Sequence, residues 1–134
     1  MDGIAWHGYA GRHEMMTRVH DAHPAKHMYW TEGGSDYTDP AYLTNWTRWS
    51  AAFTGILRNW ASSVIGRNLA LDEKGRPNIG LFTCGGRVTI NGTTGEITRS
   101  GMDWAFAHDA RLHLAGKAVD VALPADSVTS LTWR

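Results

Sequence analysis

Hydrophobic and polar positions follow two different periods in the first third of the chain. Residues 3–9 and 26–31 are short apolar runs, partly aromatic, and glycines close both of them. Such runs predict buried strands. Between them, residues 13–21 carry apolar side chains at helical spacing until Pro24 stops the pattern. The pattern therefore predicts a strand, a helix and a second strand.

A longer amphipathic segment follows, and a third apolar run comes after it. Asp39 and Pro40 are typical of a helix start, because aspartate caps free amides and proline suits the first turn. The helix they open has an apolar stripe of Trp46, Trp49, Phe53, Ile56, Leu57 and Trp60. Residues 63–71 are predicted to form a third strand. Alternating strands and helices favour a parallel sheet with crossover helices, which is an α/β fold.

The pattern changes after Asp72. Residues 87–90 and 96–98 flank a turn-rich segment and predict a β-hairpin. Residues 102–112 are predicted to be helical. The tail, residues 118–133, alternates in period two and predicts two strands of an antiparallel sheet.

Composition excludes several classes of function. Thirteen basic and thirteen acidic residues cancel, so no net charge favours nucleic acid or an anionic membrane. No apolar run approaches the roughly 20 residues of a membrane-spanning helix. The segment after Met1 has no signal-peptide pattern, and localisation stays open. Cys84 is the only cysteine, which excludes an internal disulfide and a multi-thiolate metal site.

Seven tryptophans and fifteen glycines are many for 134 residues. Sugar-binding proteins are often rich in both, because sugar rings stack on indoles. The alternative is that most of the tryptophans fill the core, where one aromatic side chain buries roughly 150–250 Å². We expect about two thirds of them to do so.

Glu32 ends the second predicted strand, just before two glycines. Catalytic groups of barrel enzymes project from such strand ends. Strand alternation places Trp30 on the same face, beside the carboxylate. A glutamate at a strand end is, however, more often a solvated or capping residue. His7 and Tyr9 share one face of the first strand, where they either orient a carboxylate or pack as core residues.

Metal and other nucleophile motifs are incomplete. His13 and Glu14 begin like a zinc-protease helix, but Thr17 stands where the second histidine belongs. The histidines around Pro24 cannot share one helix face, so neither a metal site nor a cofactor is predicted. Cys84 has no evident activating base and is taken as structural.

Three segments together resemble glycoside hydrolase family 30, the glucosylceramidase-like enzymes. They are GIAWHGYAG (3–11), YWTE (29–32) and NLALDEKGRPN (68–78), with WAFAH (104–108) following in the same order. The resemblance covers about residues 3–112. It implies part of a (β/α)8 TIM barrel, about strands six to eight, in residues 1–112. Residues 113–134 would be a remnant of the accessory β-sandwich.

The resemblance also implies roles for individual residues. Glu32 corresponds to the catalytic nucleophile, and His7, Tyr9 and Trp30 line the sugar site. Arg67 stands where many family members have a tryptophan against the sugar. The family's acid/base glutamate lies on the fourth barrel strand, commonly after asparagine, and the sequence has no Asn-Glu pair.

These observations predict a piece of a retaining β-glucoside hydrolase that is inactive alone. Its substrate would be a glycoside or oligosaccharide, and family members act on glucosylceramide, β-1,6-glucans and xylans. Intact members are often secreted or lysosomal. Unpaired strand edges predict self-association or a complementing amino-terminal barrel fragment. The alternative is a non-catalytic carbohydrate-binding or interaction module that uses Trp6, Trp30 and Tyr9 for stacking.

Overall fold

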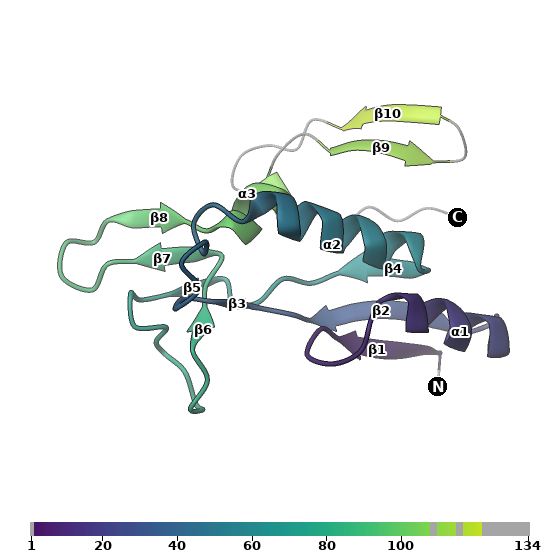
Figure 1. The fold of residues 1–134 in the computed structure, drawn as a ribbon, viewed down its shortest axis with the longest axis horizontal. Helices are drawn as coiled ribbons and strands as arrows, with labels where there is room; N and C mark the ends of the chain where they lie inside the picture. The colour runs from purple at the N-terminus through teal and green to yellow at the C-terminus, as the bar shows by residue number, and fades with distance from the viewer. Residues whose placement is uncertain (1, 108–109, 115–116, 122–134) are drawn as a thin grey trace.

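A computed structural model describes residues 2–107, 110–114 and 117–121, and it shows a mixed α/β protein. The first half alternates strands and helices along the chain (Figure 1): β1 (Gly3–His7), α1 (Glu14–Ala22), β2 (His27–Glu32), α2 (Trp46–Arg58) and β4 (Ala61–Val64). The three strands form a parallel sheet in the order β1-β2-β4. The predicted parallel sheet with crossover helices is therefore confirmed.

Both helices pack against the sheet through one apolar cluster. Its buried members come from both helices, from the middle of the sheet and from a later helix: Met16, Met28, Phe53, Ile56, Ala61 and Met102. Met16, Met28 and Met102 are at most 1% exposed. Full burial of such a side chain stabilises the fold by about 1.5–3 kcal/mol. This cluster holds β2 rigidly in the centre of the sheet.

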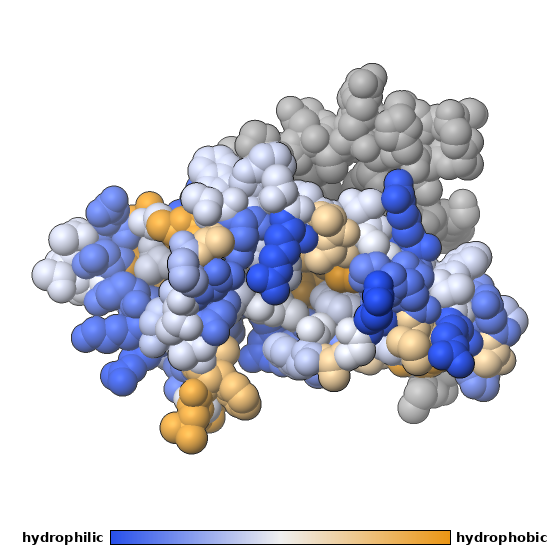
Figure 2. Space-filling view, viewed as in Figure 1, coloured by the Kyte–Doolittle hydropathy of each residue, from blue (hydrophilic) through white to orange (hydrophobic). Residues whose placement is uncertain are grey.

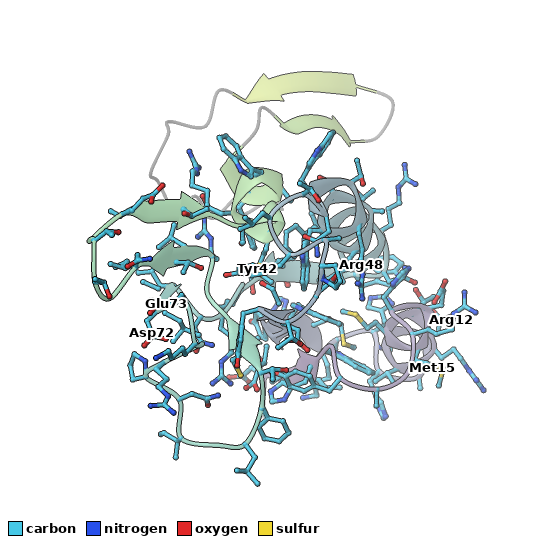
Figure 3. The ribbon with its side chains drawn as sticks, turned by 60° about the vertical axis from the view of Figure 1, so that its left-hand side comes forward. Arg12, Met15, Tyr42, Arg48, Asp72 and Glu73 are labelled. Carbon is cyan, nitrogen blue, oxygen red and sulfur yellow. The ribbon has the colours of Figure 1, made fainter. Side chains whose placement is uncertain are left out.

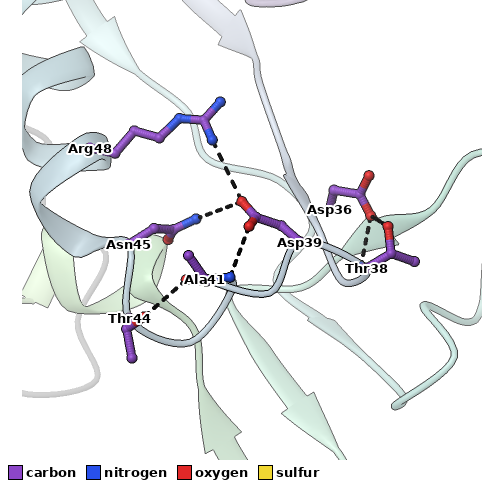
Figure 4. Close-up of polar contacts among 7 residues, drawn as sticks. All are labelled: Asp36, Thr38, Asp39, Ala41, Thr44, Asn45 and Arg48. Carbon is purple, nitrogen blue, oxygen red and sulfur yellow. Dashed lines mark hydrogen bonds and ion pairs between the residues drawn. The ribbon is translucent and has the colours of Figure 1, made fainter.

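The start of α2 differs from the prediction. Asp39 and Pro40 lie in a run of turns, and the helix begins only at Trp46. The Asp39 carboxylate accepts hydrogen bonds from the Ala41 amide (2.9 Å) and from Asn45 (3.4 Å), and it pairs with Arg48 at 3.6 Å (Figure 4). Aspartate caps a turn here instead of a helix.

The third predicted strand, residues 63–71, is interrupted. It consists of β4 and of β5 (Ala70–Leu71), which belong to different sheets. Between them, Gly66 lies under Phe106, and a Cβ atom there would come within 2.5 Å of that ring. After Val64 the chain stays hydrogen-bonded to the end of β2 as far as Arg67, and it then enters a second sheet at β5.

The second sheet contains the predicted hairpin. β7 (Val88–Ile90) pairs antiparallel with β8 (Ile97–Arg99) and parallel with β5. A two-stranded antiparallel sheet of β3 (Ser35–Asp36) and β6 (Cys84–Gly85) lies between the two larger sheets in Figure 1. The segment from β5 to β6 thus returns to the end of β2.

The last predicted helix is shorter than expected. α3 spans Gly101–Ala107, and the next residues form an antiparallel hairpin of β9 (Ala110–Leu114) and β10 (Lys117–Val121). The predicted domain boundary at residue 112 falls inside β9. The first residues of the segment predicted to form two strands, residues 118–133, lie in β10, and residues 122–133 lie outside the described residues.

On the face seen in Figure 2, apolar side chains project at the bottom of the view. The loop of residues 74–83 carries the exposed side chains of Ile79, Leu81 and Phe82. None of the helices in the described ranges has the length and hydropathy to cross a bilayer.

A buried ion-pair cluster ties the second sheet to α3. Asp103 is 5% exposed and bonds to Arg87 at 2.7 Å and to Arg99 at 2.5 Å. Arg87 is itself buried, and its guanidinium lies over the Phe106 ring, 4.7 Å from the centroid. Removing the carboxylate would leave a buried cation without its counter-ion.

We expect Asp103→Ala to lower the free energy of unfolding by about 3–5 kcal/mol, because breaking a buried pair strands its partner charge. Urea unfolding followed by circular dichroism measures this. The matched control is Glu96→Ala at an exposed position, where a change within about 0.5 kcal/mol is expected. Equal effects of the two substitutions would contradict this role of Asp103.

Candidate functional site

The carboxyl ends of the three parallel strands meet at one edge of the sheet. His7 is the last residue of β1 and Glu32 the last of β2. Arg67 follows β4 and forms a parallel bridge with Gly34. Parallel strands place such residues side by side, which is why barrel enzymes build their sites at this edge. Three residues far apart in the sequence are brought together here.

A register shift between β1 and β2 sets the direction of Glu32. Trp6 pairs with Trp30, but the next residue, His7, pairs with Glu32, so Thr31 is an extra residue in β2. The extra residue breaks strand alternation. Glu32 therefore lies on the same face of the sheet as His7, whereas Trp30 lies on the opposite face. The prediction that Trp30 lies beside the Glu32 carboxylate is therefore wrong.

Trp30 packs instead against the core cluster on the helix side of the sheet. It lies under two glycines that flank the site. A Cβ atom at Gly8 would come within 2.6 Å of the Trp30 ring, and one at Gly33 within 3.1 Å of its Nε1 atom. The Gly8 amide also donates a hydrogen bond to the Glu32 carbonyl at 2.8 Å. Glycine at position 8 leaves room for the Trp30 ring.

Three side chains surround the Glu32 carboxylate. The Tyr9 hydroxyl donates a hydrogen bond to Oε1 at 2.7 Å, and Arg67 contacts the same oxygen at 2.5 Å. His7 Nε2 lies 3.7 Å from Oε2. The Glu32 side chain is 24% exposed, and its carboxylate contacts side chains from neighbouring segments. The expectation that Glu32 lies with His7 and Tyr9 is confirmed.

The same contacts favour the ionised form of Glu32. The hydrogen bond from Tyr9 lowers the pKa of its carboxyl group most, and the bond from Arg67 adds to this. Desolvation opposes the shift, but the pKa still falls below the ordinary value of 4.5. Hydrogen bonds to the charged form stabilise that form. Glu32 is therefore a carboxylate at neutral pH.

Tyr9 remains protonated in this position. Its pKa is raised to about 12, first by partial burial and then by the hydrogen bond to Glu32 and that residue's negative charge. The phenol is thus a donor throughout the physiological range. The Cys84 thiol also acts on the pKa values of Tyr9 and Arg67, so it lies near this cluster. No local pattern around Cys84 could have shown this, because β6 reaches the site only through its pairing with β3.

The two carboxylate oxygens of Glu32 are chemically different. Oε1 takes the short contacts from both Tyr9 and Arg67, whereas Oε2 has only the longer contact to His7. Such an arrangement fixes the group through one oxygen and leaves the other available to a substrate. No cluster of three metal-ligating side chains occurs among residues of the described ranges. The geometry suits a positioned, anionic nucleophile.

Comparisons with known proteins show that most of this chain is similar to part of two endo-1,6-β-glucanases. It is 32% identical over 123 residues to the endo-1,6-β-D-glucanase of Neurospora crassa; the match covers 87% of this chain and 25% of that protein. Among solved structures, the endo-β1,6-glucanase BT3312 matches 77% of this chain and 24% of its own, with a TM-score of 0.68 and 30% identity. No protein-family model matches the chain.

A third match concerns the fold alone. SrfJ from Salmonella typhimurium superposes on 78% of this chain with a TM-score of 0.68 at 20% identity, and the match covers 24% of that chain. The chain thus spans about a quarter of the length of the proteins it matches. The similarity to endo-1,6-β-glucanases supports the predicted resemblance to glycoside hydrolases. It does not support the narrower prediction of a glucosylceramidase-like enzyme.

We expect Tyr9→Phe to raise the pKa of Glu32 toward 4.5, because the substitution removes the largest stabilising hydrogen bond. In the unsubstituted chain, the lowered pKa of Glu32 contributes to the stability of the fold above pH 4.5. This contribution is lost as the pH falls through the pKa that Glu32 has in the folded state. NMR titration of the Glu32 carboxyl carbon measures the change. Tyr29→Phe on β2 is the matched control and should leave the titration unaltered. An unchanged midpoint in Tyr9→Phe would refute the assigned contact.

Proposed function

We propose that this chain carries the nucleophile side of a retaining family 30 glycoside hydrolase site. The observation that supports it is the Glu32 carboxylate, ionised and fixed through Oε1 at the carboxyl edge of a parallel sheet. In this proposal β1, β2 and β4 are about the sixth to eighth strands of a (β/α)8 barrel. The similarity to endo-1,6-β-glucanases supports the same assignment.

The nucleophilic atom in this proposal is Glu32 Oε2. It attacks the anomeric carbon while the glycosidic C–O bond breaks, which gives a covalent glycosyl ester. Tyr9 and Arg67 hold Oε1, so the attacking oxygen keeps one direction. A water molecule then hydrolyses the ester and restores the carboxylate. These steps need carboxyl groups and water but no cofactor.

The acid/base carboxyl group is assigned to a barrel strand outside the described residues. A retaining enzyme needs it about 5–5.5 Å from the nucleophile. The groups that act on the pKa of Glu32 are Tyr9, Arg67 and His7, with no carboxylate among them. Within the described residues β1 and β4 are edge strands of the parallel sheet. Further strands, from a complementing fragment or another copy, would fit against these edges.

The proposed substrate is a β-1,6-linked glucan. The sequence leaves glucosylceramide, β-1,6-glucan and xylan open, and two similar proteins are endo-1,6-β-glucanases. A sphingolipid substrate has no such support. Arg67, at the position where tryptophan commonly faces the sugar, would contact both Glu32 and the bound sugar. Glu32 at the end of β2 and Tyr9 just after β1 would complete this side of the site.

Covalent labelling tests the nucleophile without requiring the acid. A 2-fluoro-β-glucoside with a dinitrophenolate leaving group needs no protonation to react, so we expect the 134-residue chain to gain one fluoroglycosyl mass on Glu32. Peptide mass mapping locates the adduct. Glu32→Gln should abolish labelling, whereas Glu73→Gln, a second glutamate after a strand, should not. Labelling elsewhere, or none at saturating reagent, would overturn the proposal.

We also expect the chain alone to hydrolyse unactivated β-1,6-glucan negligibly. General acid–base assistance contributes typically ~10²–10⁴-fold, and the proposed acid is outside the described residues. Reducing-sugar assays with the purified chain measure this. Turnover that Glu32→Gln abolishes would contradict the assignment of the acid to another segment.

A further inference from the structure

The turn between β7 and β8 contains the one Asn-Gly pair of the sequence, Asn91-Gly92. A glycine after asparagine leaves the next backbone nitrogen unhindered, so this nitrogen can attack the asparagine side chain. Among the described residues other than its chain neighbours, a Cβ atom at Gly92 would meet only the Glu73 carboxylate oxygens, at 3.7 and 3.8 Å. Residues 92–97 are exposed. Water therefore reaches the turn, and Gly92 lies open beside a carboxylate.

The side-chain carbonyl of Asn91 is polarised by two backbone amides. Its Oδ1 atom accepts hydrogen bonds from the Thr93 and Thr94 amides, both at 2.9 Å. The Asn91 main chain is held as well, because its amide donates to the Glu96 carbonyl and its carbonyl accepts from the Gly95 amide, both at 2.8 Å. When a nucleophile adds to the side-chain carbonyl, negative charge develops on Oδ1, and the two amides stabilise this charge as an oxyanion hole does. The carbonyl group is therefore both fixed and activated.

A base lies at the other reacting atom. Glu73 comes just after β5, the parallel neighbour of β7, and Figure 3 labels it beside the hairpin turn. Its Oε2 atom accepts a hydrogen bond from the Gly92 amide at 2.9 Å. This bond is the main cause that lowers the pKa of Glu73, so the group is ionised at neutral pH and can accept a proton. The fold thus brings a carboxylate from a distant segment to the nitrogen of the Asn-Gly pair.

We infer that Asn91 is a site of self-catalysed deamidation, in which Glu73 acts as the general base. The Gly92 nitrogen bonds to Asn91 Cγ while Glu73 accepts its proton. The bond between Cγ and Nδ2 then breaks, and Glu73 returns the proton to Nδ2, which leaves as ammonia. Water opens the resulting succinimide on either side of its nitrogen and gives aspartate or isoaspartate at position 91. The reaction needs only water, and it does not depend on the proposed glycosidase function.

Incubation of the folded chain in ¹⁸O-labelled water at neutral pH tests the inference. Hydrolysis of the succinimide incorporates the heavy oxygen, so peptide mass mapping distinguishes this reaction from deamidation during digestion. We expect aspartate and isoaspartate to accumulate at position 91, and the formally neutral chain to gain a negative charge on ion exchange. Glu73→Gln should slow the reaction roughly tenfold, less than the usual ~10²–10⁴-fold of general-base assistance, because Glu73 is exposed.

Two comparisons separate the action of Glu73 from general effects of folding. In concentrated urea, Glu73→Gln should deamidate as fast as the unsubstituted chain, because the contact with Gly92 exists only in the folded state. Asn78 is an internal control in another exposed loop. Its Oδ1 atom accepts a hydrogen bond from the Gly80 amide at 3.1 Å, but Ile79 stands where glycine follows in the reactive pair. Asn78 should therefore stay intact.

A second variant keeps the test independent of the stability of Glu73→Gln. Gly92→Ala leaves Glu73 in place, and its methyl group finds only ordinary contacts, but it hinders the attacking nitrogen. We expect this variant to deamidate more slowly than the unsubstituted chain. Equal or faster deamidation of folded Glu73→Gln would show that Glu73 shields the amide, and would overturn the inference. An unchanged rate in Gly92→Ala, or an Asn91 that reacts no faster than Asn78, would overturn it too.

Discussion

The extra residue in β2 determines what the sheet edge can do. Were β1 and β2 in continuous register, strand alternation would place Glu32 on the helix side with Trp30. The shift after Trp6 and Trp30 instead pairs Glu32 with His7, on the face where Tyr9 and Arg67 lie. The ionised state of Glu32 and the difference between its two oxygens both follow from this placement.

The packing beneath the site keeps that placement fixed. Trp30 fills the space under Gly8 and Gly33 and belongs to the cluster that buries Met16 and Met28. One strand therefore supplies core packing on one face and a carboxylate on the other.

Several elements of the fold could be predicted from periodicity. The parallel strands, the crossover helices and the hairpin of β7 and β8 all followed from apolar spacing and turn residues. The start of α2 could not, because Asp39 is equally suited to cap a turn and does so here. At the break between β4 and β5, Gly66 packs against Phe106, a residue forty positions away in the sequence, and no local pattern encodes that contact.

The site, too, could be predicted from the sequence only in part. Strand ends and the resemblance to known hydrolases identified Glu32, His7 and Tyr9, and their meeting is confirmed. The error over Trp30 arose because one inserted residue reverses alternation without any signature of its own. The nearness of Cys84 depended on the pairing of β3 with β6, which joins segments almost fifty residues apart. Short-range patterns thus gave the elements and the nucleophile candidate, while long-range packing set their orientations.

The most direct test of the central claim is a crystal structure of the chain trapped as its fluoroglycosyl adduct. The account predicts an ester bond at Glu32 Oε2, with Oε1 still bonded to Tyr9 and Trp30 on the opposite side of the sheet. An unmodified Glu32 that faces bulk solvent, or one that shares the face of Trp30, would contradict it.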